Sequence, residues 1–272
     1  MKVSLVWPRW DGYVFCLRLV GGLTLAFLLA PIVIVFITSF TAGHYIAFPP
    51  KLPLGLTWYE EFFASERYFG AFLNSLLVGA LTMLLSLALG LTAALGYTRR
   101  RFKGRTAVYY LILSPFLMPA IILGISLLLS LGSFGLQGSY LVLVLAHSLW
   151  AAPLVFLIMV AVLQGMDPAL RDAAMNLGAG PVRTFFEVTL PMARAGVISS
   201  ALLAFVVSFH EFAMALFLTS PSTQTLPVVI WTSLRFEVRP VIAAVDSIMI
   251  GMVMLTLLVI AKLIGIEKIR IG

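Results

Sequence analysis

Charged side chains are scarce in this chain. Only 11% of its 272 residues are charged, against about 25% in an ordinary soluble domain, and its mean hydropathy is +1.08. Charge is absent from residues 19–50, 68–98 and 106–166, which hold 32, 31 and 61 residues, whereas a helix crosses a bilayer with about 20. These runs exclude a water-soluble fold. They are apolar on every face, without the alternation of a membrane strand, so they exclude a β-barrel as well.

Motifs for disulfide, metal and nucleotide chemistry are also missing. Cysteine is limited to Cys16, which rules out an intrachain disulfide, and no spacing of His or Cys resembles a metal site. The chain lacks the GxxxxGK[ST] loop that cradles phosphates, so we expect it to hydrolyse no ATP by itself. A membrane enzyme is a poor interpretation, because no nucleophile or metal site accompanies the histidines and carboxylates of the apolar runs. We therefore expect no catalytic residue and no cofactor in this chain.

The apolar runs that are present predict an all-α polytopic membrane protein with a single transmembrane domain, 1–272. The six expected helices are about 19–41, 71–98, 107–131, 140–163, 194–219 and 241–265. The turn between the third and fourth is supplied by Gly132, Ser133, Gly135 and Gly138. In the second, Ser86, Gly90 and Ala94 recur every four residues, a small-residue face that lets another helix approach closely, or that faces lipid. Between the first two, Thr57 and Glu60 predict a short interfacial helix.

The distribution of basic residues predicts orientation. Six spans put both termini on one side of the membrane. That side carries 14 of the 18 Lys and Arg residues, five of them within 99–105, and the other side carries Lys51, Arg67, Arg235 and Arg239. Because positive residues accumulate in cytoplasmic loops, the termini are expected in the cytoplasm. The net charge of +7 does not indicate nucleic-acid binding, since the basic residues are dispersed at the ends of apolar runs.

A cytoplasmic loop between the fourth and fifth spans, residues 164–193, is the most informative segment. Asp167 followed by Pro168 predicts a helix start, and Gly178 predicts its end. A second short helix is expected from Pro181. Two short helices joined at a glycine corner form a compact protrusion suited to docking in a groove of a partner protein, an interpretation that fits better than a plain connecting loop.

This loop resembles a known signature. Asp172, Ala173 and Ala174 are followed after three residues by Gly178, and after nine more by the run 188–191, which ends with Leu190 and Pro191. The spacing matches the EAA motif of ABC importer permeases, with Asp in place of Glu and Val in place of Ile. The resemblance implies the type I importer fold, with this loop as the coupling helix that contacts an ATP-binding subunit. The residues to which it assigns coupling are Asp172, Ala173, Ala174, Asn176, Gly178, Ala179, Gly180, Leu190 and Pro191.

Similarity to the spermidine/putrescine-type permeases extends over almost the whole chain. The residues that carry it are 48–50, Trp58, Tyr59, Asn74, Ser75, 118–124, His147, 176–180, 208–212 and 225–228. It implies two copies of an ATP-binding subunit that holds ATP and Mg²⁺, a second and related permease subunit, an external solute-binding protein, and a bacterial inner-membrane location. The implied solute is a polyamine or a related small amine or amino-acid-like compound.

Polar residues within the apolar runs are the candidates for the translocation pathway or its gate. They are Asn74, Ser208, His210, Glu211 and Asp246. An ionised residue at the centre of a membrane helix costs about 2.5 to 3.5 kcal/mol, so Glu211 and Asp246 need partners or a watery cavity. Helical spacing places Glu211 on a small and polar stripe with Ser200, Ala204, Ser208, Ala215 and Thr219. We interpret Glu211 as a pathway, gate or seam residue, with an internally satisfied structural carboxylate as the alternative.

Two of these residues depart from the family pattern. His210 stands where relatives commonly have Asp, and Asp246 stands where Ser or Thr is expected, so one acid is lost and another gained. If the acids serve a cationic solute, a less cationic or zwitterionic substrate becomes an alternative. Asp246 also fits a snorkelling acid near the membrane surface, and His147 and Asn74 fit hydrogen-bonded helix packing. The competing function is a proton- or ion-coupled secondary transporter that uses His210, Glu211 and Asp246.

Overall fold

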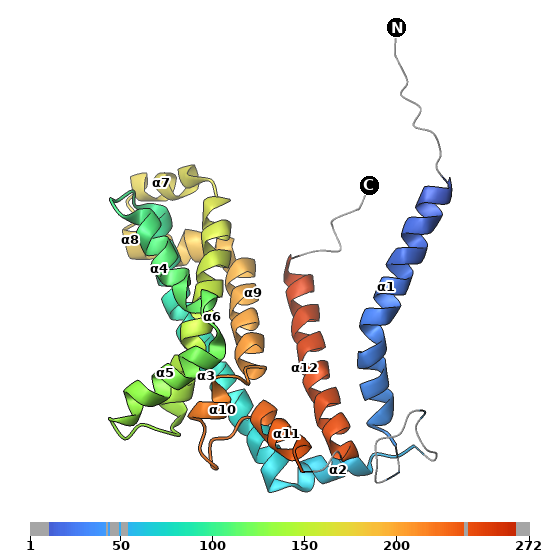
Figure 1. Cartoon of the computed structure of the whole chain (residues 1–272). Coiled ribbons are helices and arrows are strands. Elements are labelled where there is room, and N and C mark those ends of the chain that lie inside the picture. Colours follow the sequence, from blue (N-terminus) through green and yellow to red (C-terminus); the bar gives the residue numbers. More distant parts are fainter. Residues whose placement is uncertain (1–10, 42, 44–48, 50–53, 237–238, 265–272) are drawn as a thin grey trace. The chain divides into compact units, whose positions relative to one another are not determined.

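A computed structural model of the chain describes residues 11–41, 43, 49, 54–236 and 239–264. Every regular element among them is helical (Figure 1). In chain order these are α1 (Asp11–Thr38), α2 (Thr57–Ala64), α3 (Glu66–Arg99), α4 (Arg105–Leu117), α5 (Ala120–Gly132), α6 (Tyr140–Gln164), α7 (Pro168–Asn176), α8 (Pro181–Thr184), the π-helix η1 (Phe185–Thr189), α9 (Leu190–Phe209), α10 (Ala215–Leu218), α11 (Leu226–Leu234) and α12 (Pro240–Ile264).

Five straight stretches of the described residues are long and apolar enough to cross a membrane. They are Val14–Thr38, Glu66–Arg99, Tyr140–Gln164, Pro181–Phe209 and Pro240–Leu263. A sixth crossing requires α4 and α5 to count as one span, although they meet at an angle of 94°. The predicted span over 107–131 therefore consists of two helices rather than one. Pro115 lies in the last turns of α4 and Pro119 directly precedes α5, and a proline interrupts the helical hydrogen-bond ladder.

The predicted fifth span over 194–219 is wrong at its end. The helix begins earlier, at α8, and it stops at Phe209, after which the chain turns into the four-residue α10. A loop then leads to α11, which sequence analysis did not predict because its nine residues are too short for a span. Thr225 followed by Leu226 and a proline at the helix start was the signal available for it. We call residues 210–225 the excursion.

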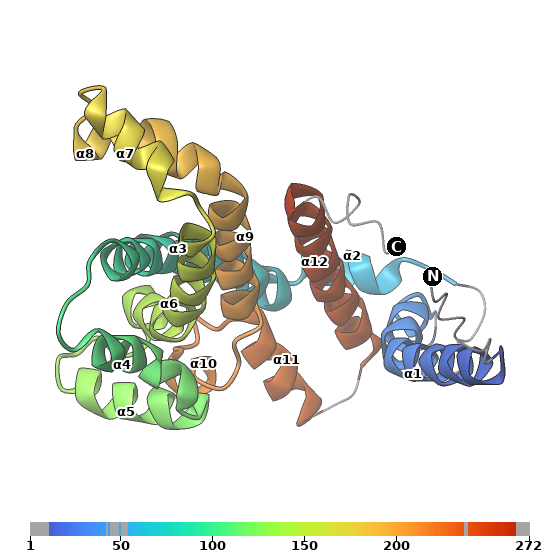
Figure 2. The same ribbon diagram turned by 90° about the horizontal axis from the view of Figure 1, so that it is seen from above.

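The predicted small-residue face of α3 packs against α6. Ser86, Gly90 and Ala94 are buried, and a Cβ built on Gly90 would lie 2.7 Å from the Val155 Cβ of α6. In lipid, where apolar surface gains little from leaving its surroundings, helices associate chiefly by such close packing. α3, α6 and α9 contact one another pairwise, and α4 and α5 lie along the outer side of α6 (Figure 2).

Two compact units divide the chain. One comprises Met1–Phe62 with Val238–Ile250, and the other comprises Phe63–Glu237 with Gly251–Gly272. In the first, the Trp58 indole donates to the Thr41 carbonyl at 2.7 Å, Ser39 Oγ lies 2.7 Å from Tyr59 Oη, and Arg239 pairs with Glu61 at 2.9 Å. These contacts hold the end of α1 and the start of α12 to α2, the short helix expected after Thr57.

Some predictions fall outside the described residues. Phe48 and Pro50 of the family resemblance are among them, as are residues 1–10 and 265–272, which contain both termini and the last residue of the sixth predicted span. The location of the termini stays a prediction.

Candidate functional site

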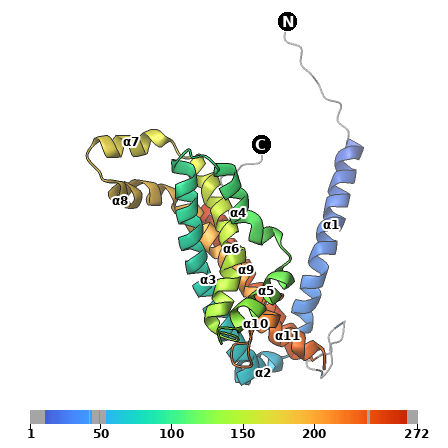
Figure 3. The same ribbon diagram turned by 60° about the vertical axis from the view of Figure 1, so that its left-hand side comes forward.

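The segment from α7 to η1, residues 167–189, stands at one end of the α3, α6 and α9 group, where it projects away from the helix ends (Figure 3). We call it the α7–η1 segment. Its first helix starts where the sequence predicts it. The carboxylate of Asp167 accepts the backbone N–H of Ala169 at 2.9 Å, and Pro168 is the first helical residue, where its missing N–H leaves no donor unpaired.

The glycine corner at the end of α7 is a complete Schellman motif. The N–H of Gly178 donates to Met175 O at 3.0 Å, and the N–H of Ala179 donates to Ala174 O at 3.1 Å. Gly178 has a φ of 90°, a left-handed conformation that a side chain with a Cβ rarely adopts. The signature glycine is therefore required by the backbone, and it directs the chain into α8.

The end of the signature lies at a change of helix type. The π-helix η1 leads into α9 without a break, and the N–H of Leu190 reaches back five residues to Phe185 O. Pro191 follows and has no N–H to continue the ordinary ladder, so a wide turn before it leaves fewer unpaired groups. Apolar side chains remain uncovered on this segment, with Leu177 89% and Val182 71% exposed.

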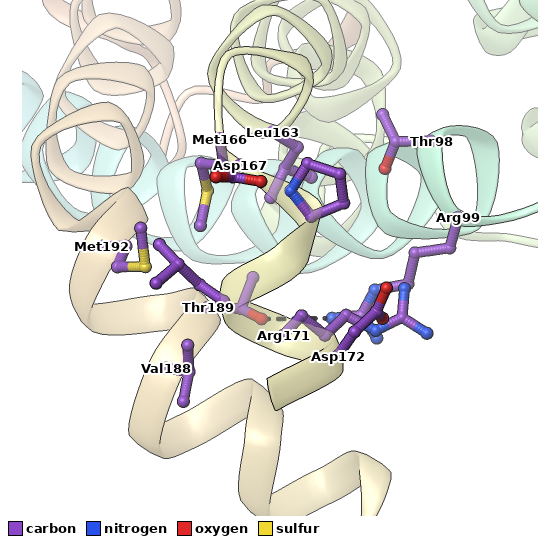
Figure 4. Close-up of a pocket in the computed structure, with 12 residues that line it drawn as sticks. Thr98, Arg99, Leu163, Met166, Asp167, Arg171, Asp172, Val188, Thr189 and Met192 are labelled. Carbon is purple, nitrogen blue, oxygen red and sulfur yellow. Dashed lines mark hydrogen bonds between the residues drawn. The ribbon is translucent and has the colours of Figure 1, made fainter. Parts of the chain in front are cut away.

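A cavity of about 300 Å³ lies between α7, η1 and the adjoining ends of α3 and α6 (Figure 4). Arg99, the last residue of α3, reaches across it to donate to Thr189 Oγ1 at 3.4 Å. Asp172, the signature acid, lines the same cavity as Arg99 and Arg171. The other coupling candidates on α7 and its corner, among them Ala173, Asn176 and Gly180, are exposed or half-exposed. Asp172 is itself exposed, so the signature acid lines the cavity from the same accessible surface that carries the other coupling candidates.

Glu211 lies in the excursion, two residues beyond the end of α9 at Phe209. It is only 5% exposed, and its two carboxylate oxygens accept the N–H groups of Met214 and Ala215, each at 2.9 Å. The predicted stripe through Glu211 is wrong, because the chain leaves the helical path after Phe209 and the residues on either side of the break share no helix face. The geometry favours the structural alternative, a carboxylate that satisfies the backbone of a membrane-embedded turn.

His147 of α6 lies beside this carboxylate. Its Nδ1 hydrogen-bonds with Ser208 Oγ at 2.8 Å, and its Nε2 lies 3.5 Å from Glu211 Oε2. The ring is 1% exposed, and Nε2 has no hydrogen-bond partner among the described residues. The structure thus brings Ser208 and Glu211 together through a histidine that sequence reasoning assigned only to helix packing.

The remaining pathway candidates are His210, Asp246 and Asn74. His210 is exposed, and its Nδ1 lies 3.2 Å from Val206 O of its own helix. Asp246 is half-buried on α12 in the other unit, and no described side chain bonds it. Asn74 is structural: its amide donates to the carbonyls of Ser222 and Gln224 at 3.0 and 2.9 Å, so it holds the excursion in place.

Other residues that hold the excursion were missed from the sequence. Ser75 Oγ accepts the N–H of Leu226 at 2.8 Å, and the hydroxyl of Thr223 donates to Gly138 O at 2.9 Å. Tyr140 donates to Asn74 Oδ1 at 2.7 Å. The available signal was the polar pair Asn74 and Ser75 within an apolar run. The residues that this pair bonds in the later part of the chain lie about 150 residues away in sequence, so no local pattern could identify them.

Comparison with known proteins gives a family and a fold. Residues 86–266 match the family described as "Binding-protein-dependent transport system inner membrane component". The chain is 31% identical over 234 residues to the putrescine transport system permease protein PotI of Escherichia coli (strain K12), covering 84% of this chain and 83% of that one. It is 29% identical over 246 residues to the spermidine/putrescine transport system permease protein PotC of Haemophilus influenzae, covering 88% and 92%.

Solved structures agree on the fold. A chain of a bacterial ABC transporter involved in the import of the acidic polysaccharide alginate matches with a TM-score of 0.75 at 15% identity, over 95% of this chain and 99% of that chain. The same transporter in complex with an alginate pentasaccharide-bound periplasmic protein gives 0.66 at 18% identity. The predicted all-α fold of an importer permease is confirmed.

Proposed function

Because this chain belongs to the family of inner-membrane components of binding-protein-dependent transport systems, and is thus the permease component of an ABC importer, we propose that it forms part of a pathway for polyamines. Two relatives that match most of its length bear the names of a putrescine and a spermidine/putrescine permease. If acids in the pathway serve a cationic solute, the exchanged acids at His210 and Asp246 make a less cationic solute the alternative, and we keep a zwitterionic amine as the second candidate.

The observation that carries the coupling role is the α7–η1 segment. Its glycine corner presents a compact surface with uncovered apolar side chains, among them Leu177 and Val182, at one end of the helix group. Such a surface suits the groove of a soluble partner. In our proposal the partner is an ATP-binding subunit, present twice in the complex, which holds ATP and Mg²⁺ and hydrolyses the nucleotide. A second, related permease completes the pathway, and an external binding protein delivers the solute.

Orientation follows from charge. The excess of basic residues on the side of the α7–η1 segment supports a cytoplasmic position for this segment and for both termini. The excursion and α11 then face the outside, where the binding protein docks. ATP-driven closure of the partner subunits displaces the α7–η1 segment, and α6 and α9 carry that displacement to the excursion.

The secondary-transporter alternative gains no support from the family or from the geometry. Both oxygens of Glu211 are occupied by backbone N–H groups, and His210 bonds only its own helix among the described residues. A proton relay needs titratable groups that reach one another or water.

Reconstitution tests the proposal. The importer, purified with its own ATP-binding, permease and solute-binding proteins, is placed in liposomes and supplied with radiolabelled putrescine. We expect uptake that requires ATP and the binding protein, and that unlabelled spermidine inhibits. ATP-dependent uptake of a radiolabelled zwitterionic amine such as glycine betaine, with no uptake of putrescine, would select the second candidate. Uptake by this chain alone under an imposed proton gradient would refute the importer mechanism.

A further inference from the structure

Two helices join the α7–η1 segment to the excursion. α6 ends at Gln164, close to the Asp167 cap of α7, and α9 follows η1 directly. Both run to the opposite end of the helix group, where α9 ends and the excursion begins (Figures 1 and 3). The 25 residues of α6 span roughly 37 Å at 1.5 Å per residue. A displacement of the α7–η1 segment reaches the excursion only if these two helices move together.

Close side-chain packing holds α6 and α9 together near the α7–η1 segment. A Cβ built on Gly196 of α9 would lie 2.5 Å from Val162 Cγ2 of α6, so the glycine is the residue that permits this approach. Met159 and Ala193 are buried in the same cluster of side chains. Close-packed contacts of this kind transmit displacement because protein interiors compress little.

Polar contacts hold them together at the other end. One imidazole on α6 bonds Ser208 in the last turn of α9 and touches Glu211, the carboxylate that shapes the turn of the excursion. All three side chains are buried. The unpaired Nε2 of His147, 3.5 Å from Glu211 Oε2, can form a further hydrogen bond after a movement of about half an ångström, because such bonds lie near 2.9 Å.

We propose that His147 is a positioning residue for transport. It ties α6, the last turn of α9 and the start of the excursion into one body, so that displacement of the α7–η1 segment moves the excursion by the same amount. This assignment rests on the proposed function, in which that segment receives the movement of the ATP-binding subunit. A histidine that serves packing alone would stabilise the fold without setting the efficiency of coupling.

Substitutions separate the two contacts of the ring. His147→Asn keeps an amide near the position of Nδ1 and so near Ser208, but it is too short to reach Glu211. His147→Gln extends toward Glu211 and gives up Ser208, and His147→Leu removes both contacts. Ser208→Ala deletes the partner, and Ser199→Ala is its matched control. Both serines are buried on α9, but the Ser199 hydroxyl has no hydrogen-bond partner among the described residues.

The measurement is the ratio of ATP hydrolysis with and without solute-loaded binding protein, in the whole importer reconstituted in liposomes. Thermal unfolding and the amount of copurified ATP-binding subunit are recorded beside it. For His147→Leu we expect the ratio to fall about 5- to 30-fold, which is the change that about 1 to 2 kcal/mol makes in an equilibrium. Copurification should match the wild type. Ser208→Ala should lower the ratio and Ser199→Ala should not. His147→Asn and His147→Gln should give ratios between those of the wild type and His147→Leu.

A normal ratio in folded His147→Leu would overturn the assignment. Equal effects of Ser208→Ala and Ser199→Ala would do so too, as would ratios that follow thermal stability across the series. If His147→Leu does not assemble, the Asn and Gln variants and the serine pair decide the question by the same ratio. A wild-type complex that lacks an ATP-binding subunit would refute the proposed function itself, a result that is distinct from all of these.

Discussion

The α7–η1 segment and the excursion are both irregular interruptions between long helices, yet they are held in different ways. The α7–η1 segment is closed by bonds between near neighbours: Asp167 caps Ala169, Ala179 bonds Ala174, and Arg183 pairs with Glu187. The excursion has local bonds too, but it is also held by groups 82 to 150 residues away in sequence, among them Asn74, Tyr140 and Gly138. A locally closed segment can move as a body against its surroundings, whereas the excursion keeps its shape only while α3 and α6 stay in place.

The largest effect is expected from breaking the local closure. Gly178→Val forces a β-branched residue into a φ of 90°, a strain of about 1 to 3 kcal/mol, so the corner should open and uptake should fall about tenfold or more. The chain should still enter the membrane. Uptake of radiolabelled putrescine and copurification of the ATP-binding subunit measure the result.

The control for that variant is Gly96→Val. Gly96 lies within α3 and has nothing within 4 Å of a built Cβ. Unimpaired uptake by Gly178→Val at normal expression would contradict the requirement for a left-handed corner.

A smaller effect is expected where the excursion is held by one side chain. Glu211→Gln has a single acceptor oxygen, so one of the N–H groups of Met214 and Ala215 loses its partner, at a cost of about 1 to 3 kcal/mol. We expect a lower Tm and a several-fold loss of uptake in the assembled complex. The exposed Glu60→Gln on α2 is the control. A raised Tm would show that the charge of Glu211 destabilises the protein and that its hydrogen bonds to the N–H groups of Met214 and Ala215 contribute little.

The bonds from α3 to the excursion and to α11 should act in proportion to their number. Asn74→Ala removes two hydrogen bonds to the excursion, and Ser75→Ala removes one to Leu226, the first residue of α11. Each net bond contributes about 0.5 to 1.5 kcal/mol. The first variant should therefore lower the midpoint of thermal unfolding more than the second. The reverse order would indicate that the Leu226 N–H is the critical group.

Topology can be examined with two cysteine substitutions, one of them in the excursion. Cysteine at Thr106 and at Ser222, in a background without Cys16, should leave uptake unchanged. An impermeant thiol reagent should label the first only from the cytoplasmic side and the second only from outside, because positive residues favour the inside. Opposite labelling would invert the orientation that we propose.

The same contrast explains what could be predicted from the sequence. The start of α7 at Asp167 and Pro168 and its end at Gly178 are encoded by neighbouring residues, and the structure has them where the sequence puts them. The end of α9 at Phe209 carries no proline or glycine, and apolar residues continue past it. Its position depends on Glu211 and on distant partners such as His147, so hydropathy extended the helix to 219. The sequence indicated hydrogen-bonded packing for Asn74, but it could not identify Ser222 and Gln224 as the partners.

The sharp bend between α4 and α5 shows one way in which backbone hydrogen-bonding groups are accommodated where a helix is interrupted away from water. Proline at 119 brings no N–H to its position, so the interruption creates fewer donors that need acceptors, and the Pro119 carbonyl still accepts the N–H of Ile122 at 3.0 Å. The interruption after α9 keeps its donors and provides a carboxylate to receive them. The first break reduces the number of backbone donors that need acceptors, and the second provides acceptors for the donors that remain. The first break depends on the missing N–H of Pro119 and the second on the carboxylate of Glu211, so each break rests on the chemistry of one side chain.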